Sequence, residues 1–115
     1  MIALSFLANC LIAFPLVMPM LRRSDAMDAA FGPPSDARRI LACIYGTIGL
    51  ISLFSLFCIA AGYGDFARQI AQTLLPLQII YKCFTIPAVG LQSVVVKTNI
   101  GVSLLHLLTL VSVTL

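Results

Sequence analysis

Four long apolar stretches dominate the sequence, and each is long enough to cross a lipid bilayer. A spanning helix needs about 20 apolar residues to cover roughly 30 Å of hydrocarbon. The stretches cover residues 1–21, 40–62, 67–90 and 98–115. Since short connections make consecutive helices antiparallel neighbours, the sequence predicts an all-α integral membrane protein: a single domain with four transmembrane helices in an up-down bundle.

The composition agrees with lipid as the main solvent. Apolar residues make up 61% of the chain and charged residues 10%, whereas soluble domains are about half apolar and about a quarter charged. Too few polar side chains remain to cover the surface of a soluble fold. The first stretch is followed directly by two arginines and lacks a cleavage site of small residues, so we expect a retained helix rather than a signal peptide.

The connection over residues 22–39 carries most of the basic side chains. Its four arginines are Arg22, Arg23, Arg38 and Arg39. Basic residues in short loops stay in the cytoplasm, so we expect an N-out, C-out protein of a bacterial inner membrane, with an organellar inner membrane as the alternative. We interpret the arginines as anchors at the lipid head groups rather than as a ligand site.

The same connection also has signals for local structure. Ser24 or Asp25 is a suitable N-cap for a short interfacial helix over residues 26–30, which the glycine and two prolines of residues 32–34 would end. Ser35 then stands at the N-cap position of the second span.

Most constellations that support chemistry are missing from the sequence. The isolated cysteines form no C-x-x-C pair, which argues against a thiol redox centre or a metal site. They are Cys10, Cys43, Cys58 and Cys83. Glutamate is absent and the aspartates lie outside the apolar stretches, whereas a proton-coupled exchanger needs an acid at membrane depth. We expect neither enzyme activity nor, at a net charge of +3, nucleic-acid binding.

Polar side chains form a stripe along the third stretch. Gln78, Tyr81, Lys82 and Thr85 recur at helical spacing, and the same stepping brings Gln92 to this face. A lysine at the bilayer centre costs roughly 2.5 to 3.5 kcal/mol on insertion scales. Lys82 could reach the cytoplasmic head groups, pair with an acid of another subunit, or bind an anionic ligand. We favour the first interpretation, because it needs only lipid.

The single histidine, His106, lies in the middle of the fourth stretch, between Ser103 and Thr109. A neutral imidazole there is a candidate axial ligand of a haem or of a chlorophyll-type pigment. One histidine cannot form a bis-histidine haem site within one chain, and Val102 stands where antenna helices carry a small residue. We therefore expect a packed, hydrogen-bonded histidine and no cofactor.

Small residues form a stripe along the second stretch. They are Ala42, Gly46, Gly49 and Ser52. Such a stripe lets another helix backbone approach closely, so it predicts a helix contact. The partner helix could belong to this chain or to another subunit.

Two segments resemble small uncharacterised four-helix proteins of the bacterial inner membrane. They are FGPPSDARRILACIY, which leads into the second stretch, and LQIIYK, which is followed by Pro87. With an asparagine and a histidine in the last helix, the similarity covers residues 31–110. It implies the four-helix topology and supplies no catalytic residue.

Two functions are compatible with these features. The first is a non-catalytic accessory or structural subunit of a larger energy-converting complex, photosynthetic or respiratory, in contact with lipids and other membrane subunits. The absence of reactive groups, an unpaired Lys82 and the small-residue stripe favour it. The second is a small homo-oligomeric transporter or ligand-binding bundle, with Gln78, Tyr81 and Lys82 lining a cavity. We favour the first, because one four-helix chain leaves little room for a permeation path.

Overall fold

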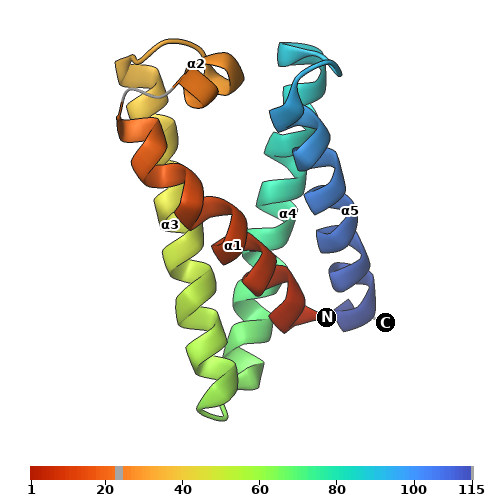
Figure 1. The fold of residues 1–115 in the computed structure, drawn as a ribbon. Coiled ribbons are helices and arrows are strands. Elements are labelled where there is room, and N and C mark those ends of the chain that lie inside the picture. Colours follow the sequence, from red (N-terminus) through yellow and green to blue (C-terminus); the bar gives the residue numbers. More distant parts are fainter. Residues whose placement is uncertain (23–24, 115) are drawn as a thin grey trace.

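The computed structural model describes residues 1–22 and 25–114, and the regular structure in these residues is entirely α-helical. The helices are α1 (Ile2–Leu21), α2 (Asp25–Phe31), α3 (Asp36–Ala60), α4 (Gly64–Val89) and α5 (Val94–Thr114). The long helices run alternately up and down, and both chain ends lie at the same end of the molecule (Figure 1). Helix α1 packs along α3 and α4 packs along α5, while α3 and α4 converge toward the turn that joins them.

Three helices of the described chain, α1, α3 and α5, are long and apolar enough to cross a membrane. Helix α4 is 26 residues long, but its glutamines and Lys82 lower its hydropathy. The all-α class is therefore confirmed, and the chain has the character of a membrane protein.

Each of the last three long helices begins earlier than the apolar pattern predicts. Helix α3 begins at Asp36 instead of residue 40, and α4 and α5 begin at Gly64 and Val94 instead of residues 67 and 98. At α3 the reason is visible, because the predicted cap forms: the Ser35 hydroxyl oxygen accepts a hydrogen bond from the Arg38 backbone N–H at 3.1 Å. Hydropathy marks where the apolar side chains start, whereas the cap at Ser35 sets the first residue of α3.

Helix α2 is the short helix expected in the first connection. It ends at Gly32, whose φ of 84° lies in the left-handed region that glycine adopts without strain. Arg23 and Ser24 lie outside the described residues, so the expected Ser24 cap is not part of this description. Gln92 was expected on the polar stripe of the third stretch, but it is exposed in the turn after α4, because that helix ends at Val89.

The small-residue stripe of α3 is the contact surface for α1. A Cβ atom on Gly49 would lie 3.0 Å from the ring of Phe14, and one on Gly46 would lie 3.8 Å from Val17. Ala42 is fully buried in the same contact. The partner helix that the sequence left open is therefore a helix of the same chain.

Candidate functional site

A cluster of polar side chains is buried where α1 crosses the other long helices. Its members are Ser5, Asn9, Ser52, Gln78, His106 and Thr109, and none is more than 3% exposed. Burying polar groups costs free energy unless they are hydrogen-bonded, and in hydrocarbon no water supplies the missing bonds. The cluster therefore has to satisfy its own donors and acceptors.

Asn9 is the centre of this cluster and bonds to all three other long helices. Its Nδ2 donates to Ser52 Oγ on α3 at 3.0 Å and to Gln78 Oε1 on α4 at 2.8 Å. Its Oδ1 accepts from Gln78 Nε2 at 3.1 Å and from His106 Nε2 on α5 at 3.0 Å. The carboxamide thus uses both donors and both lone pairs within the chain.

The hydrogen bonds of the two His106 ring nitrogens show which of them carries the proton. Because Asn9 Oδ1 can only accept, the proton lies on Nε2, and Nδ1 then accepts from the Ser5 hydroxyl at 3.2 Å. Ser5 Oγ is in turn 2.6 Å from Thr109 Oγ1. A ligand on either ring nitrogen would have to displace a side chain of α1. That His106 binds no cofactor stays a prediction.

Lys82 faces into the bundle and does not extend to the head groups. Its amine donates to Asn99 Oδ1 on α5 at 2.9 Å, and the residue is only 7% exposed. Nζ also lies 5.1 Å from the ring centroid of Tyr81 and 6.0 Å from that of Tyr45. The interpretation that Lys82 reaches the head groups is wrong, because the Asn99 amide and two aromatic faces surround the amine. Within the described part of the chain, no carboxylate forms an ion pair with it.

Asn99 links Lys82 to a further member of the predicted polar stripe. Its Nδ2 donates to Thr85 Oγ1 at 3.3 Å, and the Thr85 hydroxyl donates to the Lys82 carbonyl. Neither Asn9 nor Asn99 was among the site residues expected from the sequence. Their signal was an amide within an apolar stretch, which commonly marks a hydrogen bond between membrane helices.

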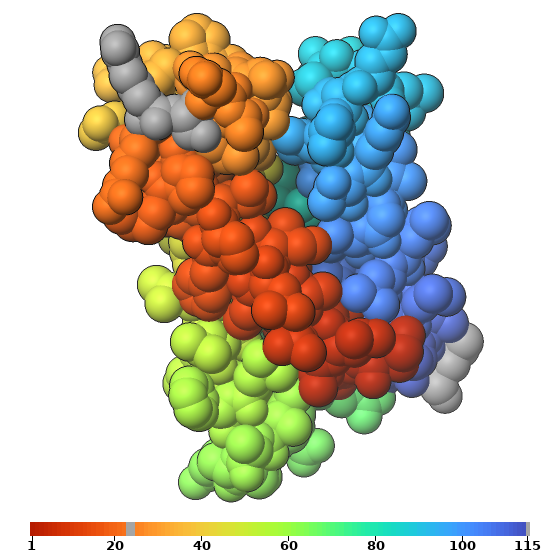
Figure 2. All heavy atoms as spheres, in the orientation of Figure 1, coloured from red at the N-terminus to blue at the C-terminus, as the bar shows by residue number. Residues whose placement is uncertain are grey.

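A cavity of about 180 Å³ lies between the α1–α3 pair and the α4–α5 pair. Polar groups contribute to its lining through Asn9, Tyr45, Gln78, Tyr81, Lys82 and Asn99. Most of the remaining wall is apolar, and includes Met27 and Phe31 of α2 and Val94 and Val95 of α5. Figure 2 shows the surface hollowed between α2 and the first turns of α5, with atoms of α4 at the floor. The structure therefore brings three residues of the predicted stripe, from Gln78 to Lys82, to one cavity.

Tyr81 lines this cavity, and its buried hydroxyl is a donor without a partner among the residues that the structure describes. An unsatisfied buried group costs about 1 to 3 kcal/mol. A bound molecule with an acceptor atom beside Tyr81 would recover part of that cost.

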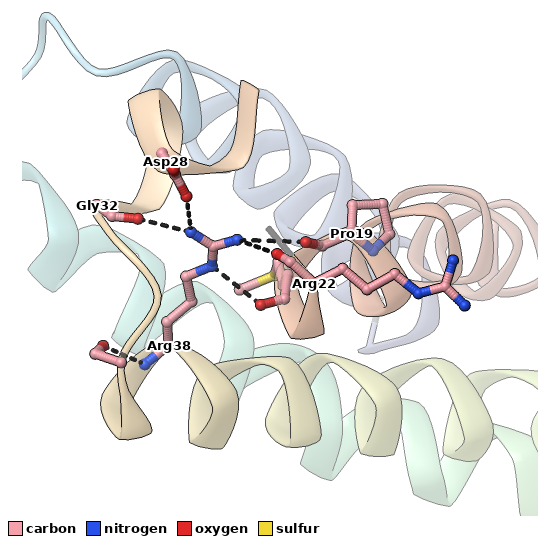
Figure 3. Close-up of polar contacts among 7 residues, drawn as sticks. Pro19, Arg22, Asp28, Gly32 and Arg38 are labelled. Atoms are coloured by element: carbon pink, nitrogen blue, oxygen red, sulfur yellow. Dashed lines mark hydrogen bonds and ion pairs between the residues drawn. The ribbon is translucent and has the colours of Figure 1, made fainter. Parts of the chain in front are cut away.

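Arg38 forms a second polar centre, where α1, α2 and α3 meet (Figure 3). Its guanidinium makes five hydrogen bonds: to the carbonyl oxygens of Pro19 (3.3 Å), Met20 (3.0 Å), Arg22 (2.8 Å) and Gly32 (2.8 Å), and to the carboxylate of Asp28 (2.5 Å). The expectation that Arg38 anchors the chain at the head groups is wrong, because this side chain is only 3% exposed. The physical reason is that the last carbonyls of α1 lack helical partners, and the five N–H groups of arginine supply them.

The other basic side chains that the structure describes lie apart from the cavity. Arg22 and Arg39 are exposed at the end where α2 lies, while Arg23 is outside the described residues. Arg68 donates to the Val113 carbonyl near the chain termini.

No protein-family model, curated protein or solved structure matches this chain. The function is therefore argued from the cavity and its lining.

Proposed function

We propose that the chain is a membrane-embedded binding protein for a small amphiphilic ligand, which occupies the cavity beside Lys82. One observation carries this proposal: a buried amine without a carboxylate partner in the described chain lines an otherwise mainly apolar cavity. Side chains that line an empty cavity lose packing contacts, so a molecule that fills this cavity would stabilise the protein.

The membrane arrangement that goes with this proposal has four spans, with α4 as the third to cross the bilayer. A helix of 26 residues is about 39 Å long at 1.5 Å per residue, which exceeds the hydrocarbon thickness. Its polar residues Gln78 and Lys82 are buried against other helices, while Leu77, Ile80 and Phe84 are at least 57% exposed. From Leu77 onward, the side of α4 that would face lipid is therefore apolar, whereas Gln69, Gln72 and Thr73 are exposed polar residues of its first half.

The exposed basic side chains favour one orientation for these spans. Arg22, Arg39 and Lys97 are exposed in the connections and first turns at the end of the bundle where α2 lies. Since basic residues of short loops stay in the cytoplasm, this end would face the cytoplasm of a bacterial cell, with both chain ends outside.

From the sequence alone, we favoured an accessory subunit of an energy-converting complex over a ligand-binding bundle. The geometry supports ligand binding better, because two features that favoured the subunit serve contacts inside the chain. Lys82 bonds to Asn99, and the small residues of α3 pack against α1. Neither feature is free for a partner, whereas the cavity is open.

Photolabelling of the protein in lipid nanodiscs tests the proposed function. The probe is a short alkyl alcohol that carries a diazirine, and the labelled peptides are mapped by mass spectrometry. We expect saturable labelling of peptides that line the cavity. Ala30→Phe, at the cavity wall, should reduce it about tenfold, and Ala29→Phe, its exposed neighbour on α2, should leave it unchanged. Labelling that is neither saturable nor confined to the cavity would overturn the proposal.

A further inference from the structure

We infer that the ligand is a monocarboxylate, with its carboxylate on Lys82 and its apolar body directed toward α2 and the start of α5. This inference rests on the proposed function and names the chemical class of the ligand. It follows from the charge of the cavity, its free hydrogen-bond donors and its size.

The single positive charge at the cavity wall favours a ligand that carries one negative charge. Lys82 is the one ionised side chain among the described lining residues, and its contacts with Asn99, Tyr81 and Tyr45 are all neutral. A buried charge is costly unless it is paired. A monoanion neutralises the ammonium group, whereas a dianion such as a phosphate monoester leaves a net negative charge in apolar surroundings. A neutral ligand leaves the ammonium without a counter-charge.

The free donors match the two oxygens of a carboxylate. An ammonium group has three N–H bonds, and the structure assigns one of those of Lys82 to Asn99. The Tyr81 hydroxyl has no partner in the described chain, and its ring centroid is 5.1 Å from the Lys82 amine. A carboxylate accepting from both groups forms charge-assisted hydrogen bonds, which are about twice as strong as neutral ones.

The distribution of polar groups orients the ligand. Lys82 lies about two turns before Val89, the last residue of α4, so the amine sits below the end of the bundle. The walls toward that end are apolar side chains of α2 and of the first turn of α5, represented by Phe31 and Val94. The charged group therefore enters first, and the apolar body points to the opening seen in Figure 2.

The size of the cavity limits the apolar body. An engineered cavity of about 150 Å³ holds one benzene molecule, and this cavity is about 180 Å³. It fits a carboxylate on a single aromatic ring or on a short alkyl chain. A longer single chain would extend through the opening, and a phospholipid with two chains would not fit.

Two photoprobes with the same short alkyl body, one ending in a carboxylate and one in an alcohol, test this inference in phosphatidylcholine nanodiscs. We expect the carboxylate to reach half-saturation at about a tenfold lower concentration than the alcohol. Lys82→Gln removes the charge but keeps an N–H donor for Asn99, so it should abolish the preference. Lys82→Arg should retain the preference, and Lys97→Gln, at an exposed lysine of α5, should not affect it.

The outcomes separate this inference from the proposed function. Equal labelling of the cavity by both probes, unchanged in Lys82→Gln, would overturn the carboxylate inference and leave ligand binding in place. Tighter binding of the matching alkyl phosphate would overturn the charge argument. Failure of both probes to label the cavity would overturn the proposed function as well. Alcohol labelling of Lys82→Gln at the parental level shows that the variant is folded, so a lost carboxylate preference then supports the inference.

Discussion

His106 and Asn9 are separated by 97 positions in the sequence, and yet His106 Nε2 donates to Asn9 Oδ1 across 3.0 Å. This bond joins the last helix to the first, and Asn9 also bonds to Ser52 of α3 and Gln78 of α4. In hydrocarbon, a side chain rotated away from this cluster would leave amide groups without partners. The cluster therefore favours one rotation of each long helix about its axis, and this arrangement leaves the cavity beside Lys82.

Replacing Asn9 should destabilise the bundle. Asn9→Ala removes four hydrogen bonds between helices, which average roughly 0.6 kcal/mol each in membrane proteins, so we expect a loss of about 2 kcal/mol. Unfolding by increasing mole fractions of SDS in mixed micelles, followed by circular dichroism, measures it. Thr47→Ala is the control, since that hydroxyl is exposed and bonds only to the carbonyl of Cys43 in its own helix. Equal stability of the two variants would contradict the role of Asn9.

Arg38 should not tolerate even a conservative substitution. Arg38→Lys keeps the charge, but a single ammonium group cannot reach the five acceptors, so carbonyl groups at the end of α1 lose their partners. We expect a loss of about 2 kcal/mol or more in the same unfolding experiment. Arg39→Lys, at the exposed neighbour, should change stability by less than about 0.5 kcal/mol. If the two substitutions have the same effect, Arg38 does not act as the cap of α1.

The contact between α1 and α3 should depend on Gly49. Gly49→Leu places a side chain where a Cβ atom alone would already be 3.0 Å from Phe14, and overpacking of this kind costs about 1 to 3 kcal/mol. Gly101→Leu is the matched control, because nothing lies within 4 Å of its Cβ position and leucine is the better helix former. Phe14→Ala should rescue part of the loss in Gly49→Leu. A loss that is the same with and without Phe14 would show that the two residues are not in contact.

The proposed arrangement with four spans predicts which connections are accessible from outside the cell. In a variant without native cysteines, Tyr63→Cys, in the connection between α3 and α4, should react with an impermeant maleimide added to intact cells. Pro34→Cys, in the connection between α2 and α3, should react only after the membrane is opened. Reaction of Pro34→Cys in intact cells would reverse the orientation. Reaction of both in intact cells would show that α3 does not cross the bilayer.

The features predicted correctly from the sequence depend on neighbouring residues. An all-helical chain follows from the apolar stretches, the start of α3 follows from Ser35, and the end of α2 follows from Gly32. Each of these involves residues within about one turn of one another, or a single apolar run, so periodicity and capping rules are sufficient.

The sequence by itself determined that this protein is helical, that it has the apolar character of a membrane protein, and that a few polar side chains lie within its helices. Only the tertiary structure decided what those side chains bind. Lys82 bonds to Asn99, and His106 bonds to Asn9. Arg38, which lies on α3, caps the end of α1. The reason is that each partner lies on another helix. The rotation and register of the packed helices select the partner. Neither the rotation nor the register can be predicted from a local sequence pattern.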